Sequence, residues 1–398
     1  MAAIKLAEGI YSVGALNPNL RVFDIIMKTE YGTSYNAYVV KGQEKTALIE
    51  TCHGRFFDEF INNIKEVVDP AEIDYIILNH TEPDHSGALH DLLELCPKAM
   101  VYGSAAAGNY LKEIVNGPFP FQKAAEGMTL DLGGRTLKFT MAPFLHWPDS
   151  MFTLVEGEDI IFTCDFFGSH YCEPRMIDKY ITYPEAYEDA LKNYYDAIFG
   201  PFAPYVQKGL QKLEGMQPKL VCTSHGPVLT EARFGYVKSK YEEWSQPVVN
   251  EKKTIEIFYV SAYHCTARAA EKIKEGIQSV LPEANVNTYD IIKYDICDLA
   301  CKLARSDAFL VGTPTINKDM LAPVTNLLSH VDVISNKGKP CAAFGSYGWS
   351  GEGVPNAVAR LKALGLGVRE ESYRFKFVPS DQDLQGAFEF GQRFAQSL

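Results

Sequence analysis

The chain has 398 residues, of which 46% are hydrophobic and 22% are charged, and its formal net charge is −12. This length exceeds that of one ordinary domain and predicts two. The negative charge argues against nucleic acid and anionic membranes as partners, and the absence of any apolar run of about 18 residues argues against a membrane-spanning helix.

The cysteines and the amino terminus point to a cytoplasmic protein. The nine cysteines are odd in number and include no Cys-x-x-Cys pair, so neither a disulfide framework nor a zinc ribbon is predicted. The first residues contain no long apolar core of the kind that a signal peptide needs. We therefore expect a reducing compartment, the cytoplasm.

The sequence of the amino-terminal part predicts strands and turns, with strands at 35–40 and 46–51 and a helix over about 55–68. A short apolar strand at 73–78 leads into a polar loop, and apolar residues at helical spacing predict a helix over 86–96. Pro83 is expected to keep the centre of the loop out of a helix.

The loop after this strand carries four potential metal ligands within six residues. They have the spacing His-x-Glu-x-Asp-His and are His80, Glu82, Asp84 and His85. A solvated loop with chance histidines and acids is the alternative, but two imidazoles and two carboxylates so close together match metal-ligand chemistry.

Three later predicted strands are each followed directly by another potential metal ligand. The runs 137–145, 159–164 and 219–224 are followed by His146, Asp165 and His225. If these strands share a pair of sheets, their ends converge on the loop at 80–85. A single histidine in such a place would more often be structural, but the recurrence favours a shared site.

The seven residues supply four imidazoles and three carboxylates without a thiolate. Seven ligands suit two ions, and Asp165 is the best candidate to bridge them. Three carboxylates favour a hard, redox-active ion such as iron or manganese. A hydrolytic zinc site would more often have a second histidine in place of Glu82, which makes Glu82 the discriminating residue.

A linker at 244–253 separates this part from one with a different rhythm. Five predicted strands alternate with five predicted helices; the strands are 254–260, 286–292, 308–311, 341–344 and 368–377, and the helices are 266–281, 296–305, 322–330, 354–364 and 381–396. This alternation predicts an open, doubly wound parallel sheet, whose ligands bind beyond the carboxyl ends of the strands.

Three loops at such strand ends have the composition of a mononucleotide site. Hydroxyls and amides at a helix start would bind a phosphate, glycines permit close backbone approach, and Tyr347 or Trp349 would cover a flat ring. No G-x-G-x-x-G is present, so FMN is favoured over a dinucleotide. The candidate residues are Ser261, Ala262, Tyr263, His264, Cys265, Thr266, Thr313, Pro314, Thr315, Asn317, Ser346, Tyr347, Gly348 and Trp349.

The chain resembles the flavodiiron proteins over nearly its full length. The motifs that carry the resemblance are the loop at 80–85, the segment 146–150, Asp165, 224–226, 312–317 and 344–349. The resemblance implies an α/β protein with an N-terminal metallo-β-lactamase-like αββα sandwich at 1–249. A flavodoxin-like, doubly wound parallel five-stranded sheet at 250–398 would follow.

The resemblance also implies the cofactors and their ligands. His80, Glu82 and His146 would hold one iron, Asp84, His85 and His225 the other, and Asp165 would bridge them in a non-haem di-iron centre. FMN would be bound by the three loops of the second domain. Glu50 and Cys265 depart from the family pattern, because relatives usually have an aspartate and a hydroxyl residue there.

The implied activity is an oxidoreductase that reduces dioxygen to water, nitric oxide to nitrous oxide, or both. Electrons would arrive from a separate donor such as a rubredoxin or a reduced deazaflavin. A head-to-tail homodimer or a dimer of dimers is implied, with no nucleic acid and no membrane as partner.

Two other functions remain open from the residues. A binuclear zinc metallo-hydrolase fused to a flavodoxin electron-transfer module is the first, and Glu82 argues against it. The second is a non-catalytic electron carrier with a structural metal. Trp147, His170 and Tyr171 are candidates to line the metal pocket, although each more often would be structural.

Overall fold

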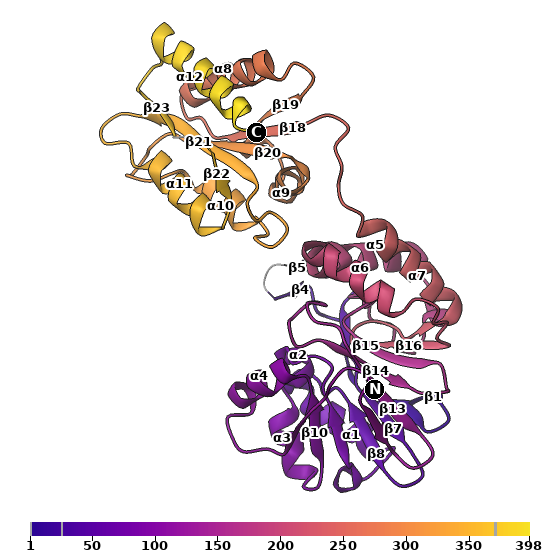
Figure 1. Ribbon diagram of the computed structural model, residues 1–398. Helices are drawn as coiled ribbons and strands as arrows, with labels where there is room; N and C mark the ends of the chain where they lie inside the picture. The colour runs from indigo at the N-terminus through magenta and orange to yellow at the C-terminus, as the bar shows by residue number, and fades with distance from the viewer. Residues whose placement is uncertain (1, 25–26, 370–371) are drawn as a thin grey trace. The chain divides into compact units, whose positions relative to one another are not determined.

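The computed structural model describes residues 2–24, 27–369 and 372–398 (Figure 1). By its internal contacts the chain divides into two compact units, Met1–Gln246 and Pro247–Leu398. No helix within the described ranges is long and apolar enough to cross a membrane.

The first unit contains two sheets that face each other. The seven-stranded sheet has the order β1 (Ile4–Ala7), β2 (Ile10–Ser12), β7 (Tyr38–Lys41), β8 (Thr46–Ile49), β9 (Tyr75–Ile77), β10 (Met100–Gly103) and β11 (Phe121–Lys123). The six-stranded sheet has the order β12 (Thr129–Asp131), β13 (Thr136–Met141), β14 (Met151–Val155), β15 (Ile160–Cys164), β16 (Leu220–Thr223) and β17 (Leu229–Thr230). Strands β8 to β11 run parallel, as do β15 and β16.

Alternation along the strands divides the core of this unit into an inner and an outer part. On β8, Ala47 and Ile49 pack between the sheets, whereas Leu48 belongs to the outer cluster. The outer faces are covered by helices, which are α1 (Phe57–Lys65), α3 (Leu89–Leu95) and α4 (Ala105–Val115) on one side and α5 (Pro184–Tyr194), α6 (Ala203–Lys212) and α7 (Glu231–Trp244) on the other (Figure 1). The αββα sandwich is therefore confirmed.

Two small pairs of antiparallel strands lie outside these sheets. One pairs β3 (Ala15–Asn17) with β6 (Thr33–Tyr35), and the other pairs β4 (Val22–Phe23) with β5 (Met27–Lys28).

The second unit is a parallel sheet of the expected kind. Its order is β19 (Asn285–Asp290), β18 (Thr254–Tyr259), β20 (Ala308–Gly312), β21 (Pro340–Tyr347) and β22 (Gly367–Val368), and β23 (Tyr373–Lys376) also pairs with β21. All these pairings are parallel. The doubly wound sheet is confirmed, with the fifth predicted strand divided into β22 and β23.

Helices cover both faces of this sheet (Figure 1). Alternate residues of β20 face opposite sides, so that Leu310 packs with α8 (Cys265–Val280) and α12 (Asp381–Gln396), whereas Val311 packs with α9 (Ile296–Arg305), α10 (Ala322–Ser329) and α11 (Gly353–Ala363). The predicted bounds of α9 and α12 agree with the structure at both ends.

Several sequence predictions in the first unit differ from the structure in extent. The strand predicted at 35–40 is interrupted after Tyr35, and the run predicted at 137–145 leaves the sheet at Met141. Trp244, assigned to the linker, is the last residue of α7. The helix predicted over 55–68 is a short 3₁₀ turn followed by α1. Hydrophobicity alone does not report where a buried chain stops pairing.

Helices α8 and α12 pack closely because glycines lie at their contact. A Cβ atom added at Gly276 would lie 2.0 Å from the carbonyl oxygen of Phe388, and one at Gly391 would lie 2.3 Å from that of Ile273. Only a residue without a side chain fits against a backbone at this distance.

We expect Gly276→Ala to lower the free energy of unfolding of the second unit by about 2–3 kcal/mol, because the two helices must separate. Urea unfolding followed by flavin and far-UV signals would measure it. Arg268→Ala, at an exposed position of the same helix, serves as the control and should change stability by less than about 0.5 kcal/mol. Equal stability of the two variants would contradict this packing.

Candidate metal centre and flavin pocket

The loop after β9 is anchored at Asn79, which connects the two sheets. Its backbone N–H donates to Glu50 Oε1 at 2.9 Å, and its side-chain oxygen accepts from Thr153 Oγ1 at 2.6 Å. Its backbone carbonyl accepts from the N–H of Met151. The loop therefore leaves the sheet at a fixed point, directly before His80.

A short helix, α2 (Pro83–Ser86), occupies the centre of the loop. The prediction that Pro83 excludes a helix here was wrong, because proline is well tolerated at the first helical position, where its missing N–H has no helical partner. Glu82 is the N-cap residue but makes no side-chain capping bond. Its carboxylate is thus free to face the site, and the helix carries Asp84 and His85.

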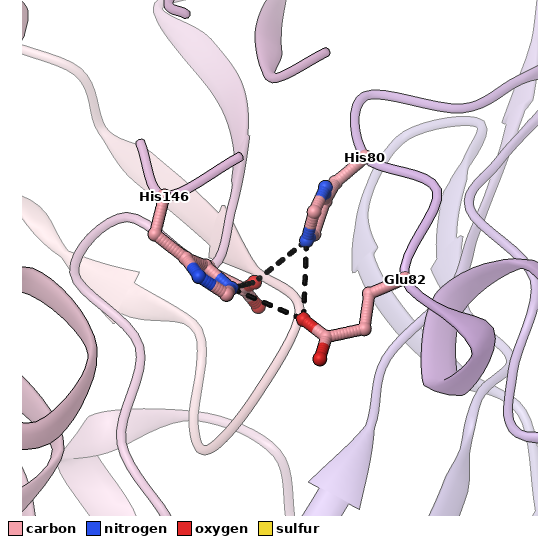
Figure 2. A group of neighbouring side chains, drawn as sticks. His80, Glu82 and His146 are labelled. Carbon is pink, nitrogen blue, oxygen red and sulfur yellow. Dashed lines mark hydrogen bonds and ion pairs between the residues drawn. The ribbon is translucent and has the colours of Figure 1, made fainter. Parts of the chain in front are cut away.

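His80, Glu82 and His146 form one half of the centre (Figure 2). Glu82 Oε2 lies 3.3 Å from His80 Nε2 and 3.1 Å from His146 Nε2. Asp165 Oδ2 lies 3.6 Å and 3.3 Å from the same two nitrogens. One imidazole nitrogen of each histidine and two carboxylate oxygens therefore surround one point.

Asp84, His85 and His225 form the other half. Asp84 lies 3.3 Å from His85 Nε2 through Oδ1 and 3.1 Å from His225 Nε2 through Oδ2. Asp165 Oδ1 lies 3.1 Å from His85 Nε2 and 3.5 Å from His225 Nε2. Each oxygen of Asp165 thus faces a different half, as a bridging carboxylate requires.

The polar atoms of this cluster fit a pair of cations. Both oxygens of Asp84, Oδ1 of Asp165 and both ring nitrogens of His85 are buried without a hydrogen-bond partner among the described residues. Cations bound between these nitrogens and oxygens would satisfy the atoms that the protein leaves unpaired. Oxygen and nitrogen ligands with three carboxylates suit a hard divalent ion such as iron.

The pKa shifts within the cluster also indicate a site for positive charge. Burial by itself would lower the pKa of His85, but the carboxylates of Asp84 and Asp165 raise it to about 9. Burial would raise the pKa of Asp165, yet the histidines, His85 above all, hold it well below its ordinary value. The site is built to stabilise positive charge at its centre.

A further layer of contacts orients the histidines. Asp149 is fully buried, lies 3.3 Å from His80 Nδ1, and accepts from the N–H and the hydroxyl of Thr81 at 2.8 Å. His225 Nδ1 lies 2.7 Å from the carbonyl oxygen of Ser34. In both rings Nδ1 is engaged, which leaves Nε2 for a metal.

Sequence reasoning missed the roles of Asp149 and Asp24. Asp149 follows His146 closely, and a carboxylate two residues before the buried strand β14 was the signal that could have shown it. Asp24 has its pKa raised to about 6 by burial and by the carboxylates of Glu82 and Asp84, which places it near the centre. It stands at a turn far from these residues in the sequence, where no pattern indicates it.

The three residues proposed to line the pocket differ in position. The Trp147 ring lies 5.0 Å from that of His80, and the His170 ring lies 5.0 Å from that of His225. Tyr171 instead packs on Tyr31 and lines a different hollow. Glu50, the departure noted in the sequence, is buried, and burial raises its pKa to about 8 despite the nearby His85.

In the second unit a cavity of about 390 Å³ opens at the carboxyl ends of β18, β20 and β21. The volume is within the range of small-molecule sites. Two hydrogen bonds fix hydroxyl side chains that line the cavity. Thr266 Oγ1 and Ser346 Oγ are 3.2 Å apart, and Ser261 Oγ accepts from the N–H of Ala267 at 3.2 Å. The first turn of α8 borders it, which suits a phosphate.

Most of the predicted flavin residues line this cavity. The exceptions are His264, which is the N-cap of α8 with φ +59°, and Thr313, whose hydroxyl donates to the carbonyl of Pro314 and accepts from the N–H of Leu321. The cavity also includes Ile316 and Ser350, which lie in two of the predicted loops, and Phe377 and Val378, which the sequence did not indicate. Tyr263 and Trp349 are 84% and 94% exposed, so both are available to cover a ring.

Comparison with known proteins gives the same two-part division. Residues 33–226 match the model of the ODP family beta lactamase, and residues 257–391 match flavodoxin. The chain is 53% identical over 401 residues to the flavo-diiron protein FprA2 of Clostridium acetobutylicum, with 100% of both chains covered. The chain belongs to the flavodiiron protein family.

Other relatives agree with this assignment. A nitric oxide reductase of Moorella thermoacetica is 33% identical, with 99% of this chain and 98% of that protein covered. The rubredoxin oxygen:oxidoreductase of Desulfovibrio gigas superposes with a TM-score of 0.74 at 29% identity, covering 99% and 98% of the two chains. This flavodiiron protein is thus an oxidoreductase with FMN and a di-iron centre as cofactors, and a zinc hydrolase is not favoured.

Asp149→Ala should lower the iron affinity about 10- to 100-fold, because His80 loses the acceptor that orients its ring. Competition with a chromophoric chelator under anaerobic conditions would measure this change. Asp131→Ala, at the exposed end of β12, is the control and should bind iron as the unchanged protein does. Unchanged affinity of Asp149→Ala would show that the ring is held by other contacts.

Trp349→Ala should weaken FMN binding about 3- to 10-fold, because an exposed aromatic ring at the cavity gains contact area only when the flavin binds. Quenching of FMN fluorescence during titration of the apoprotein would give the dissociation constant. Tyr236→Ala, an exposed aromatic residue of α7, should leave it unchanged. An effect of the same size in both variants would argue against a contact between Trp349 and the flavin.

Proposed function

We propose that this flavodiiron protein reduces dioxygen to water, nitric oxide to nitrous oxide, or both. The observation that carries the proposal is the position of Asp165, whose two oxygens face two separate groups of imidazoles and carboxylates. His80, Glu82 and His146 would hold one iron, and Asp84, His85 and His225 the other. Relatives named nitric oxide reductase and rubredoxin oxygen:oxidoreductase support both substrates.

We assign these roles to a di-iron domain at 1–249 and an FMN domain at 250–398. When bound, the two irons and FMN together supply the four electrons that dioxygen needs to become two waters, or the two that a pair of nitric oxide molecules needs. The three loops of the second domain would bind the flavin, with Ser261, Thr266 and the start of α8 at the phosphate and Tyr347 and Trp349 at the ring.

The residues of the first domain prepare the centre for this chemistry. His80 and His225 are 0% and 2% exposed, so bulk water is kept from the metal side of the rings. The carboxylates of Glu82, Asp84 and Asp165 offset positive charge inside the site, which lowers the cost of burying two cations. Asp149 and the Ser34 carbonyl hold the rings of His80 and His225 in a fixed orientation.

The remaining parts of the proposal concern partners and location. Electrons would come from an external donor, such as a rubredoxin or a reduced deazaflavin. The protein would act in the cytoplasm as a head-to-tail homodimer or a dimer of dimers. The relative from Desulfovibrio gigas, whose name includes rubredoxin, supports the first kind of donor.

The test is anaerobic reduction of the purified protein followed by rapid mixing with each gas. We expect about two irons and one FMN per chain, and fast flavin oxidation by dioxygen or by nitric oxide with nitrous oxide as the gas product. A protein that contains zinc in place of iron, or that is not oxidised by either gas, would overturn the proposal.

Asp165→Ala provides the matched variant. It should lose most of its iron and its reaction with both gases while FMN remains bound, because the bridge between the two groups is removed. Asp159→Asn, an exposed aspartate that precedes the same strand, should retain iron and activity. Iron content and gas consumption, measured side by side, separate loss of the centre from loss of the fold.

A further inference from the structure

Cys164 differs from the other buried cysteines in its surroundings. It is 1% exposed and is the last residue of β15, directly before Asp165. In the part of the chain that the structure describes, the other four buried cysteines belong to hydrophobic clusters, whereas Cys164 belongs to none; they are Cys52, Cys96, Cys222 and Cys341. Apolar packing therefore does not explain its burial.

The backbone turns this side chain away from the core. Ile160 and Phe162 of β15 pack between the two sheets, and strict alternation would place residue 164 beside them. The pairing of β15 with β16 shifts between Phe162 and Cys164, and Cys164 has φ +50°. A bulge with a left-handed residue re-aims a side chain, and a residue other than glycine adopts this conformation at a cost.

The thiol instead lies beside the metal centre. The sulfur of Cys164, a ring nitrogen of His85 and a carboxylate oxygen of Asp165 all lie within 4.8 Å of one another, and the three residues are buried. Neither nitrogen of His85 has a hydrogen-bond partner among the described residues, nor has Oδ1 of Asp165. A thiolate, an imidazole and a carboxylate are each ligands that zinc accepts in proteins.

We propose that His85, Cys164 and Asp165 form a second metal site, which binds a thiophilic divalent ion of the zinc type. An ion bound there keeps iron from binding to His85 and Asp165. The proposal rests on the proposed function only in that His85 and Asp165 are also iron ligands there. Because the two sets share these residues, zinc displaces iron rather than accompanying it. On binding, the sulfur forms a bond to the ion and releases its proton to solvent, and no electron is transferred.

The chemistry of the ligands explains the selectivity. Three protein ligands leave the fourth position of a tetrahedral site to water. Zinc binds a given set of nitrogen, oxygen and sulfur ligands more tightly than ferrous iron does, and a thiolate adds to this preference. The loading of this chain with iron is therefore sensitive to zinc, through a residue that the iron centre does not use.

The experiment uses the full chain with FMN bound and metals removed, kept anaerobic and reduced, with one equivalent of zinc. X-ray absorption at the zinc edge should show one sulfur at about 2.3 Å together with nitrogen and oxygen ligands at about 2.0–2.1 Å. Cys164→Ala should lose the sulfur and bind zinc at least about tenfold more weakly. Cys222→Ala, a buried cysteine on the neighbouring strand, should keep both.

Only nitrogen and oxygen around the zinc of the unchanged protein would overturn the proposal, as would a sulfur that persists in Cys164→Ala. Cys164→Ser replaces the alanine variant if that variant does not fold. Iron loading of Cys164→Ala is measured separately and should equal that of the unchanged protein. Failure of the unchanged protein to bind iron would overturn the proposed function and leave the sulfur result to decide the zinc site.

Discussion

The rest of the first unit depends on the burial of three carboxylates among four imidazoles. Charged groups are expensive to remove from water unless each finds opposite charge. Asp165 does this for both halves at once, because its two oxygens face different histidine pairs. The strand ends that carry these residues must therefore come together, and this requirement determines how the loops around the site are held.

The two sheets meet this requirement through contacts that cross between them. Asn79 receives a hydrogen bond from Thr153 of the opposite sheet, and Asp149, two residues before β14, faces His80, which follows β9. A shift of one sheet relative to the other would break both contacts together with the metal ligand set. The contacts that stabilise the sandwich are thus the same contacts that fix the geometry of the centre.

The sequence allowed the main features of both units to be predicted because they depend on local patterns. Apolar runs that lead into His80, Asp165 or His225 indicate candidate ligands at strand ends, and the helix–strand alternation after residue 254 predicts the second sheet. Contacts between segments that are far apart in the sequence cannot be predicted from local patterns. No local pattern shows that Asp24 approaches Glu82, or that Phe377 and Val378 border the flavin cavity, because these contacts depend on how distant segments meet.

The loop at 80–85 shows how a local rule can mislead. Pro83 was expected to exclude a helix, yet it begins one, because at the first helical position its missing N–H has no partner to lose. The helix is what brings Asp84 and His85 to one half of the centre while Glu82, at its N-cap, faces the other. Without the turn, consecutive residues of an extended loop would point to opposite sides.

In the two proposals above, the choice of metal depends on two adjacent residues at the end of β15. Asp165 offers oxygen to both halves and suits iron, whereas Cys164 offers sulfur to only one half, beside His85. A bulge and a left-handed backbone turn the thiol toward that half, although alternation alone would have left it in the apolar core. Since a thiolate favours zinc and a bridging carboxylate favours a pair of hard ions, the same strand end carries the preference for iron and the means by which zinc competes with it.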